Sequence, residues 1–181
     1  MEERIGEAFS GNEPLTVIGK QLHSGEAAPD FCLDYLDLVD RAVRTVGLAD
    51  SAGMVRLLNV VNSLERLLCQ QVTRRWEDLC ADVPPNACIY TVSMDSPQMQ
   101  ASWQDSEGVL HQALSASRSE QFGQDYGVWL KQWRLLQRAV FVIDRHAHIV
   151  YVEYVADQLH EPGYPAAMEA VHRAALERWS G

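Results

Sequence analysis

The chain has 181 residues, of which 47% are hydrophobic and 22% charged, and its formal net charge at pH 7 is −10. This length suits one globular domain spanning residues 1–181, and the negative charge without a lysine or arginine cluster argues against nucleic acid as a partner. No apolar run is long enough to cross a membrane, and the polar start MEERIGEAFSGNEP lacks the apolar centre of a signal peptide. We therefore expect a cytoplasmic protein with no membrane partner, whose residues 1–10 are flexible.

Strand-like segments dominate the first third of the chain. Three short ones are predicted at Leu15–Ile18, Phe31–Leu36 and Val43–Val46. They are followed by a mostly apolar run from Val55 to Val61, interrupted only by Arg56 and Asn59. A run of this length and composition is typical of a central strand that is buried on both faces.

The segment after this strand is predicted to be a helix. Its apolar residues recur at spacings of three and four, which places them on one side of the helix: Leu64, Leu67, Leu68, Val72, Trp76 and Leu79. Cys69 lies near the start of the same segment. We expect the apolar side to face the core.

Strands and helices alternate in the remainder of the chain. The predicted elements are a strand at Cys88–Met94, a helix that begins at Ser96-Pro97, a short strand at Val109–Leu114, a short helix at Ser119–Tyr126, an antiparallel hairpin of Ala139–Asp144 and His148–Val155, and a helix at Pro165–Trp179. The order is βαβ followed by ββα. It predicts an α/β protein with a thioredoxin-like fold, in which helices flank a central mixed sheet.

Cys69 has two interpretations. A thiolate at the start of a helix is stabilised by unpaired backbone N–H groups and by a nearby arginine, for which Arg66 is a candidate, and such a thiol is reactive. Alternatively, Cys69 is a small apolar residue buried on the core side of the helix, because cysteine is among the residues most often buried. Spacing alone leaves both interpretations open.

Several segments resemble, in the same order along the chain, the bacterial thiol peroxidases, which are atypical 2-Cys peroxiredoxins. They are GNEPLTVIGKQLHSGEAAPDF, VVNSLERLLCQQVTRRW, VSMDSPQMQASW, DYGVWLKQWRLLQRAVFVID and YVEYVADQLHEPGYPAAMEA. The resemblance extends from about Gly11 to Ala175 and implies an N-terminal β-hairpin in front of the thioredoxin-like domain. It also implies that Cys69 is the peroxidatic cysteine, which attacks the peroxide, and that Arg138 helps to hold the thiolate and the peroxide.

The chain departs from the family pattern beside this cysteine. Asn62 stands in place of a proline, Arg66 in place of a threonine, and Leu67 in place of a glycine. The threonine hydroxyl can hydrogen-bond both the sulfur and the peroxide, whereas a guanidinium is larger and only donates. Arg66 could still favour the thiolate by its charge.

The resolving cysteine of the family has no counterpart at its usual place. The matching position in SPQMQASWQDSEG is Gln104 or a close neighbour. Cys80 is predicted on the same helix as Cys69 and about 16 Å away, well beyond the reach of a disulfide. Cys32 and Cys88 are predicted on strands, as apolar fillers. An external thiol would then have to reduce the oxidised Cys69.

Other types of site find less support in the sequence. His146 and His148 share one side of a predicted hairpin tip, but no third metal ligand is spaced nearby, so we expect no metal and no cofactor. The carboxylates Glu65, Asp95, Asp105 and Glu107 form no evident acid/base pair. The apolar residues Trp129, Trp133, Leu135 and Leu136 are core or, by the resemblance, lie near the surface of a homodimer.

Two functions remain at this point. The first is a thiol peroxidase that reduces hydrogen peroxide or organic hydroperoxides, with thioredoxin or a small thiol as the reductant. The second is a catalytically degenerate paralogue that serves as a redox-sensing or binding dimer. The presence of Cys69 and Arg138 favours the first function. The three altered positions Asn62, Arg66 and Leu67, together with the missing resolving cysteine, favour the second.

Overall fold

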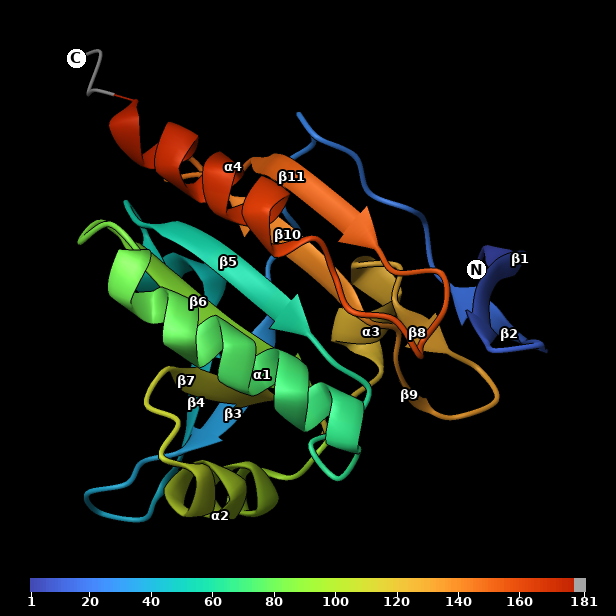
Figure 1. The fold of residues 1–181 in the computed structure, drawn as a ribbon, viewed down its shortest axis with the longest axis horizontal. Helices are drawn as coiled ribbons and strands as arrows, with labels where there is room; N and C mark the ends of the chain where they lie inside the picture. The colour runs from blue at the N-terminus through green and yellow to red at the C-terminus, as the bar shows by residue number, and fades with distance from the viewer. Residues whose placement is uncertain (178–181) are drawn as a thin grey trace.

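A seven-stranded mixed sheet forms the centre of the protein in the computed structural model, which describes residues 1–177 (Figure 1). The strand order is β11-β10-β5-β6-β7-β3-β4. Their bounds are β3 Cys32–Leu36, β4 Val43–Gly47, β5 Val55–Val60, β6 Ala87–Ser93, β7 Gln112–Ser115, β10 Ala139–Ile143 and β11 Ile149–Tyr154. Strands β5, β6 and β7 are parallel to one another, and the other pairings are antiparallel.

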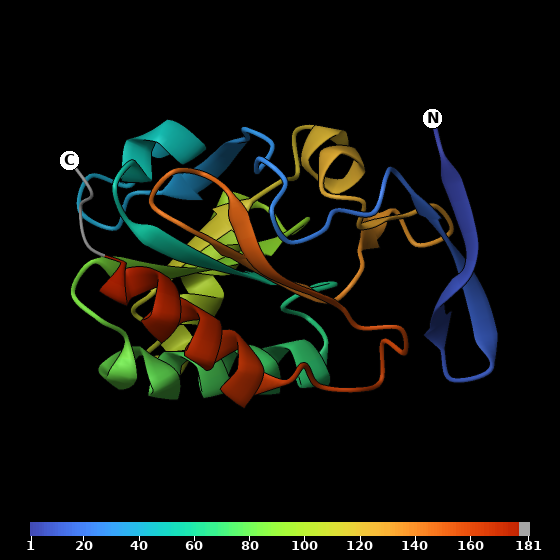
Figure 2. The same cartoon turned by 90° about the horizontal axis from the view of Figure 1, so that it is seen from above.

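Helices cover both faces of this sheet. Helix α1 (Leu67–Leu79) and helix α4 (Tyr164–Leu176) lie on one face, and the short helix α3 (Gln121–Asp125) and the 3-10 helix η1 (Leu48–Ser51) lie on the other (Figure 2). Helix α2 (Pro97–Glu107) packs against β3 and β7. A second 3-10 helix, η2 (Cys80–Asp82), continues directly from α1. Within residues 1–177, each helix is too short or too polar to span a membrane.

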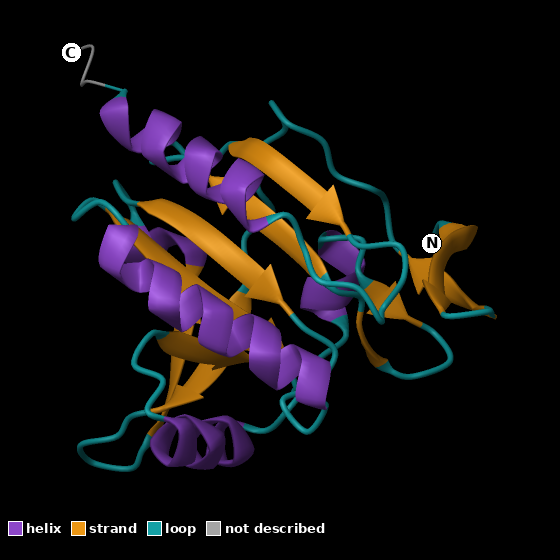
Figure 3. Ribbon diagram, viewed as in Figure 1, coloured by secondary structure: helices purple, strands orange, loops and turns teal. Residues whose placement is uncertain are grey.

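A smaller sheet lies at one end of the molecule (Figure 3). It contains the N-terminal hairpin of β1 (Glu3–Ser10) and β2 (Glu13–Ile18), followed by β8 (Trp129–Leu130) and β9 (Leu135–Leu136). The predicted N-terminal hairpin is thereby confirmed. Most of residues 1–10, for which we predicted flexibility, form strand β1 and pair with β2.

The central strand β5 is buried along its whole length. Its apolar side chains supply both faces of the core: Val55 and Leu57 face α1 and α4, whereas Leu58 and Val60 face the α3 side. The one charged side chain on this strand, Arg56, donates hydrogen bonds from its guanidinium to Ser51 Oγ and to the carbonyls of Leu48 and Asp144. A buried polar group is tolerated when its donors are paired in this way.

The predicted α/β, thioredoxin-like arrangement is confirmed, including the βαβ unit β5-α1-β6 and the ββα unit β10-β11-α4. Ser96 caps α2 as predicted, since its hydroxyl accepts a hydrogen bond from the Met99 N–H. Trp179, the predicted end of the last helix, lies outside the described residues.

Two details of the predicted elements were wrong. Leu67 was assigned to the buried side of α1 but is 80% exposed, because it is the first helical residue and points away from the sheet. The strand expected at 109–114 begins only at Gln112. The segment before it is held differently, with the Val109 N–H donating to the Gln104 carbonyl and the Leu110 N–H donating to Glu77.

A hydrogen-bonded pair, Glu77 and His111, joins the end of α1 to the segment before β7. Glu77 Oε2 lies 2.5 Å from His111 Nδ1, and the carboxylate also accepts from the backbone N–H groups of Leu110 and His111. Burial lowers the pKa of His111 despite the neighbouring carboxylate. Burial alone would raise the pKa of Glu77, but the hydrogen bonds from the His111 and Leu110 backbone hold it below its ordinary value. The pair is therefore a carboxylate accepting from a neutral imidazole.

This pair predicts a pH dependence of stability. When a histidine has a lower pKa in the folded state than in the unfolded chain, its contribution to stability is fully present above the unfolded pKa of about 6.5. That contribution is lost as the pH falls from this value through the lower folded pKa. In buffer with EDTA, we expect the free energy of unfolding to fall on acidification below about pH 6.5, and His111→Gln to reduce this fall. Urea titrations at several pH values measure the free energy of unfolding. The exposed His172 provides the control His172→Gln, which should keep the parent slope; equal slopes in all three chains would contradict the prediction.

Candidate active site

Cys69 lies at the carboxyl edge of the parallel strands. Strand β5 ends at Val60, residues 61–66 form a loop, and Cys69 is the third residue of α1. The N-cap residue, Arg66, makes no side-chain capping hydrogen bond. The first turn of α1 therefore presents its backbone N–H groups without a capping side chain, which favours a negative charge there. Ligand sites in α/β proteins commonly lie at this edge of the sheet.

Asp95 fixes the loop that leads to Cys69. It is the second residue after the end of β6, the parallel neighbour of β5. Its carboxylate accepts hydrogen bonds from Ser63 Oγ (2.6 Å), the Leu64 N–H (2.7 Å) and Ser93 Oγ (2.6 Å). Asp95, for which the sequence showed no acid/base partner, thus joins the segments that follow two neighbouring strands.

Two polar side chains approach the Cys69 sulfur. Arg138 Nη2 lies 3.5 Å from Sγ and also donates to the Gln158 carbonyl (3.1 Å). Asn62 Oδ1 lies 3.9 Å from Sγ, on the side from which it can accept the thiol proton. Arg138 is only 1% exposed, and among the described residues its Nε and Nη1 have no hydrogen-bond partner. A buried guanidinium with two free donors beside a thiol is a site for an anion or for a small molecule rich in oxygen.

Gln158 connects Asn62 to Arg138. Its Oε1 accepts from Asn62 Nδ2 (3.1 Å) and from the Arg138 backbone N–H (2.7 Å), and its own amide donates to the carbonyls of Val155 and Ala156. Asn62 Nδ2 donates further to the Leu136 carbonyl (2.6 Å). Because Nδ2 is committed to these two acceptors, the oxygen of Asn62 is the atom that faces the sulfur.

Apolar side chains cover the rest of the sulfur. Cys69 is 0% exposed and belongs to a buried cluster with Val61, Leu64, Trp103 and Val109, against which Met99 packs. Cys69 is thus buried among apolar groups, as the second interpretation expected, and its sulfur also contacts the guanidinium of Arg138. A small molecule can reach the sulfur only when this cover opens.

Arg66 does not take part in this arrangement. Its guanidinium lies over the ring of Trp133, 4.1 Å from the ring centre, and the residue is exposed. This cation–π contact stabilises the start of α1 against the β8-β9 connection. The sequence had suggested charge assistance to Cys69 by Arg66; in the structure the guanidinium that contacts the sulfur is that of Arg138.

The structure thus brings together Cys69, Asn62 and Arg138 from the predicted set. It adds three residues that sequence reasoning missed as parts of the site: Gln158, Asp95 and Trp103. Asp95 had a usable signal, because a polar residue that directly follows a parallel strand lies at the ligand-binding edge of the sheet. Gln158 and Trp103 lie in a loop and on α2, and no local pattern marks them.

The other predicted candidates lie elsewhere. His146 and His148 are exposed in the turn between β10 and β11, where their backbone N–H groups donate to Asp144. Trp129 and Leu136 are buried in the core of their own chain, as expected if they are core residues.

Comparison with known proteins agrees with this geometry. The AhpC/TSA family model matches residues 24–152, and the chain belongs to this family of thiol-dependent peroxidases. Its curated relatives narrow the class to the bacterial thiol peroxidases. The chain is 40% identical to the thiol peroxidase of Halalkalibacterium halodurans over 93% of its length and 97% of that protein, and 39% identical to that of Streptococcus sanguinis over 90% and 96%. The family suggested by the sequence motifs is confirmed.

Solved structures confirm the fold. A peroxiredoxin-like protein from Aquifex aeolicus superposes with a TM-score of 0.82 at 25% identity, covering 94% of this chain and 99% of that one. A thiol peroxidase from Chromobacterium violaceum superposes with a TM-score of 0.77 at 22% identity, covering 97% and 99%. The likeness to the second protein is one of fold.

The role of Asp95 can be tested by Asp95→Asn. The amide turns one acceptor into a donor that faces the donors of Ser63, Leu64 or Ser93, so we expect a loss of about 1–3 kcal/mol in the free energy of unfolding. Urea denaturation measures this loss. The matched control is Asp78→Asn on the exposed side of α1, with an expected change within about 0.5 kcal/mol. Similar values for both variants would show that Asp95 is no anchor.

Proposed function

We propose that the protein reduces hydrogen peroxide or small organic hydroperoxides through Cys69, and that an external thiol, thioredoxin or a small thiol, restores the oxidised cysteine. The observation that carries this proposal is the contact of 3.5 Å between Arg138 Nη2 and the Cys69 sulfur, inside a buried site where two further donors of the same guanidinium are free. Asn62 is the remaining polar neighbour of the sulfur.

Arg138 is proposed to stabilise the reactive thiolate. Two unit charges about 4 Å apart attract each other by about 4 kcal/mol at an effective dielectric constant of about 20. The guanidinium is held by Gln158, whose carbonyl accepts from Nη2 and whose side chain accepts from the Arg138 backbone. The arginine is thereby oriented before the peroxide arrives, and its free Nε and Nη1 are available for peroxide oxygens.

The reaction then proceeds in two stages. The Cys69 thiolate attacks one oxygen of the peroxide, an S–O bond forms, the O–O bond breaks, and the second oxygen leaves as an alcohol or as water after taking up a proton. The sulfur is oxidised to a sulfenic acid and the peroxide is reduced. One external thiolate next attacks this sulfur and releases water, and a second thiol breaks the mixed disulfide and restores Cys69.

The need for an external thiol is proposed from the positions of the other cysteines, all four being free thiols. Cys80 is at the opposite end of α1, about 16 Å from Cys69. Cys88 on β6 lies opposite Arg56, near the start of β5. It is therefore about 13 Å along the sheet from Val60, the end of β5 from which the loop to Cys69 departs. Cys32 lies three strands away from β5, about 14 Å across the sheet. A disulfide needs Cα atoms within about 7 Å.

Peroxide consumption tests the roles of Cys69 and Arg138. We expect Cys69→Ser to abolish consumption in the presence of a thiol reductant. Arg138→Gln keeps a polar side chain without the charge and should lower the second-order rate constant with peroxide at least about tenfold, which corresponds to about 1.4 kcal/mol of transition-state stabilisation. Arg138→Lys should retain more activity than Arg138→Gln.

Alkylation of Cys69 by iodoacetamide at pH 7 serves as a second readout in the same variants, because only the thiolate reacts. A slower alkylation in Arg138→Gln is expected. Circular dichroism identifies any variant that fails to fold. If Arg138→Gln, correctly folded, consumes peroxide and reacts with iodoacetamide at the parent rates, Arg138 does not perform the proposed role.

The fate of the oxidised cysteine gives a further prediction. One equivalent of hydrogen peroxide, without reductant, should yield a sulfenic acid on Cys69 that a dimedone probe traps, as measured by mass spectrometry. The single variants Cys32→Ser, Cys80→Ser and Cys88→Ser should give the same yield. An intramolecular disulfide that disappears in one of them would identify a resolving cysteine and reject the external thiol.

A second function is favoured by one observation. The sulfur is fully covered, and the atom of Asn62 that faces it is an acceptor, which stabilises a protonated thiol or a sulfenic acid rather than a thiolate. A redox-sensing or binding homodimer would use this property.

Asn62→Pro separates the two functions. A faster reaction of this variant with peroxide supports a peroxidase that Asn62 slows. No peroxide turnover by the parent protein or by Asn62→Pro supports the sensor. Cytoplasmic location and homodimer formation stay predictions.

A further inference from the structure

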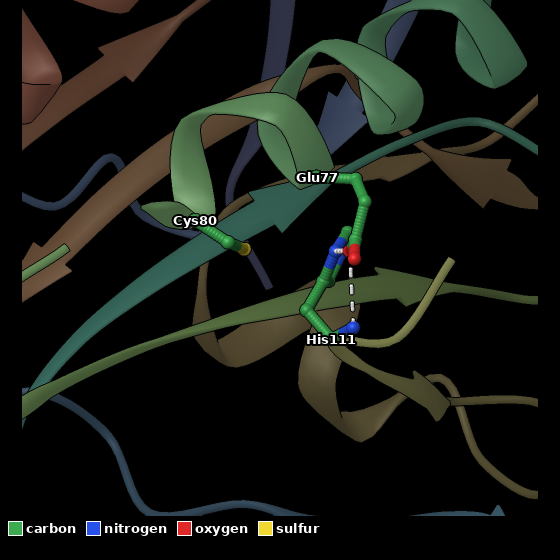
Figure 4. Close-up of side chains that lie close together, drawn as sticks. All are labelled: Glu77, Cys80 and His111. Atoms are coloured by element: carbon green, nitrogen blue, oxygen red, sulfur yellow. Dashed lines mark hydrogen bonds and ion pairs between the residues drawn. The ribbon is translucent and has the colours of Figure 1, made fainter. Parts of the chain in front are cut away.

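Glu77, Cys80 and His111 form a cluster at the end of α1 that the proposed peroxidase chemistry does not use (Figure 4). Each offers one ligand atom, and these atoms lie within 4.8 Å of one another. Glu77 is on the last turn of α1, Cys80 begins η2, and His111 lies just before β7. Among residues 1–177, this is the one group of three histidine, cysteine or carboxylate side chains with such spacing.

We propose that this cluster binds a divalent zinc-type cation through Cys80 Sγ, His111 Nδ1 and a Glu77 carboxylate oxygen. A thiolate, an imidazole and a carboxylate together form a ligand set that zinc accepts in tetrahedral geometry, with water in the fourth position. Two anionic ligands balance the charge of a divalent cation.

The surroundings already orient two of the three ligands. His111 Nε2 lies 2.8 Å from Thr91 Oγ1, and the Glu77 oxygens accept from the backbone N–H groups of Leu110 and His111, each at 3.0 Å. Metal-binding histidines typically donate their second ring N–H to a fixed acceptor, and metal-binding carboxylates are typically hydrogen-bonded as well. In the loaded site Thr91 Oγ1 would be this acceptor, and it is itself held by Asn59 Nδ2 (3.0 Å).

The metal-free arrangement differs from a loaded site in a defined way. Glu77 Oε2 and His111 Nδ1 are now 2.5 Å apart, and Nδ1 donates its proton to the carboxylate. With a cation at Nδ1, this proton moves to Nε2 and is donated to Thr91 Oγ1. Cys80 loses its thiol proton, so binding releases one proton per cation. Since zinc lies about 2.0–2.3 Å from each ligand atom, the carboxylate must move back slightly and the sulfur must move inward.

A nucleophilic Cys–His–Glu triad is the competing interpretation of these residues, and the electrostatics oppose it. Burial, together with the Glu77 carboxylate, raises the pKa of Cys80 to about 11, so the free thiol stays protonated at neutral pH. A bound cation reverses this effect, because a coordinating thiol is deprotonated by the metal. Cys80 and His111 also line a surface cleft of about 310 Å³, through which a hydrated ion can enter.

Cobalt and zinc binding by the full chain tests the proposal. The chain should carry Cys69→Ser, so that the thiol of the candidate active site cannot bind the added ion. Cobalt(II) should bind one equivalent per chain and give the near-ultraviolet charge-transfer band of a thiolate complex, and zinc should displace it. Zinc should also raise the thermal unfolding midpoint, because an ion that binds only the folded state stabilises it.

Matched variants separate this site from chance binding. Cys80→Ser and His111→Gln should remove the charge-transfer band and the thermal shift, and Thr91→Val should weaken zinc binding about tenfold or more. Cys88→Ser, which alters the same cleft, and Cys32→Ser should bind as the parent chain does. Binding that survives Cys80→Ser, or no one-to-one binding by a parent chain that circular dichroism shows to be folded, overturns the proposal. Neither result depends on peroxidase activity.

Discussion

The functional part of this structure depends on one buried guanidinium. Arg138 is removed from water at the start of β10, and its paired donors reach only the Cys69 sulfur and the Gln158 carbonyl. Desolvating such a charge is costly unless an anion or a hydrogen-bonding ligand compensates it. The Gln158 carbonyl offsets part of that cost and the Gln158 side chain holds the arginine backbone, so that the Cys69 sulfur is the other described partner of the guanidinium. The chemistry of this site follows from that electrostatic requirement.

The scaffold that supports this contact has three independent attachments. Parallel pairing of β5 and β6 brings their carboxyl ends together, so that Asp95 can fasten the loop before α1. Packing of Val72 and Trp76 against β5 holds the helix on the sheet. Stacking of Arg66 on Trp133 then joins the helix start to the smaller sheet. Each attachment uses a different interaction, and together they set the position of Cys69.

Local patterns in the sequence were sufficient for helices α1, α2, α3 and α4 and for the strands of the seven-stranded sheet, whereas β8 and β9 of the smaller sheet were not predicted. The mostly apolar run of β5, the Ser-Pro start of α2 and the two apolar segments of β10 and β11 around a short turn are properties of neighbouring residues, and each element formed as expected. The direction of Arg66 could not be predicted in this way, because it depends on Trp133, a residue 67 positions later in the chain. The same holds for Gln158 beside Asn62 and for His111 beside Glu77 and Cys80, which only the folded sheet brings together.

Gln104 has a consequence for how this molecule reports oxidation. By the resemblance, Gln104 or a close neighbour stands where the family carries its second cysteine, and the Gln104 amide donates to the carbonyls of Val109 and His111, which ties α2 to the segment before β7. If Cys69 is oxidised as proposed, α2 offers it no thiol at this position and need not unwind to supply one. The oxidised state would then be confined to the Cys69 sulfur until an external thiol reacts with it.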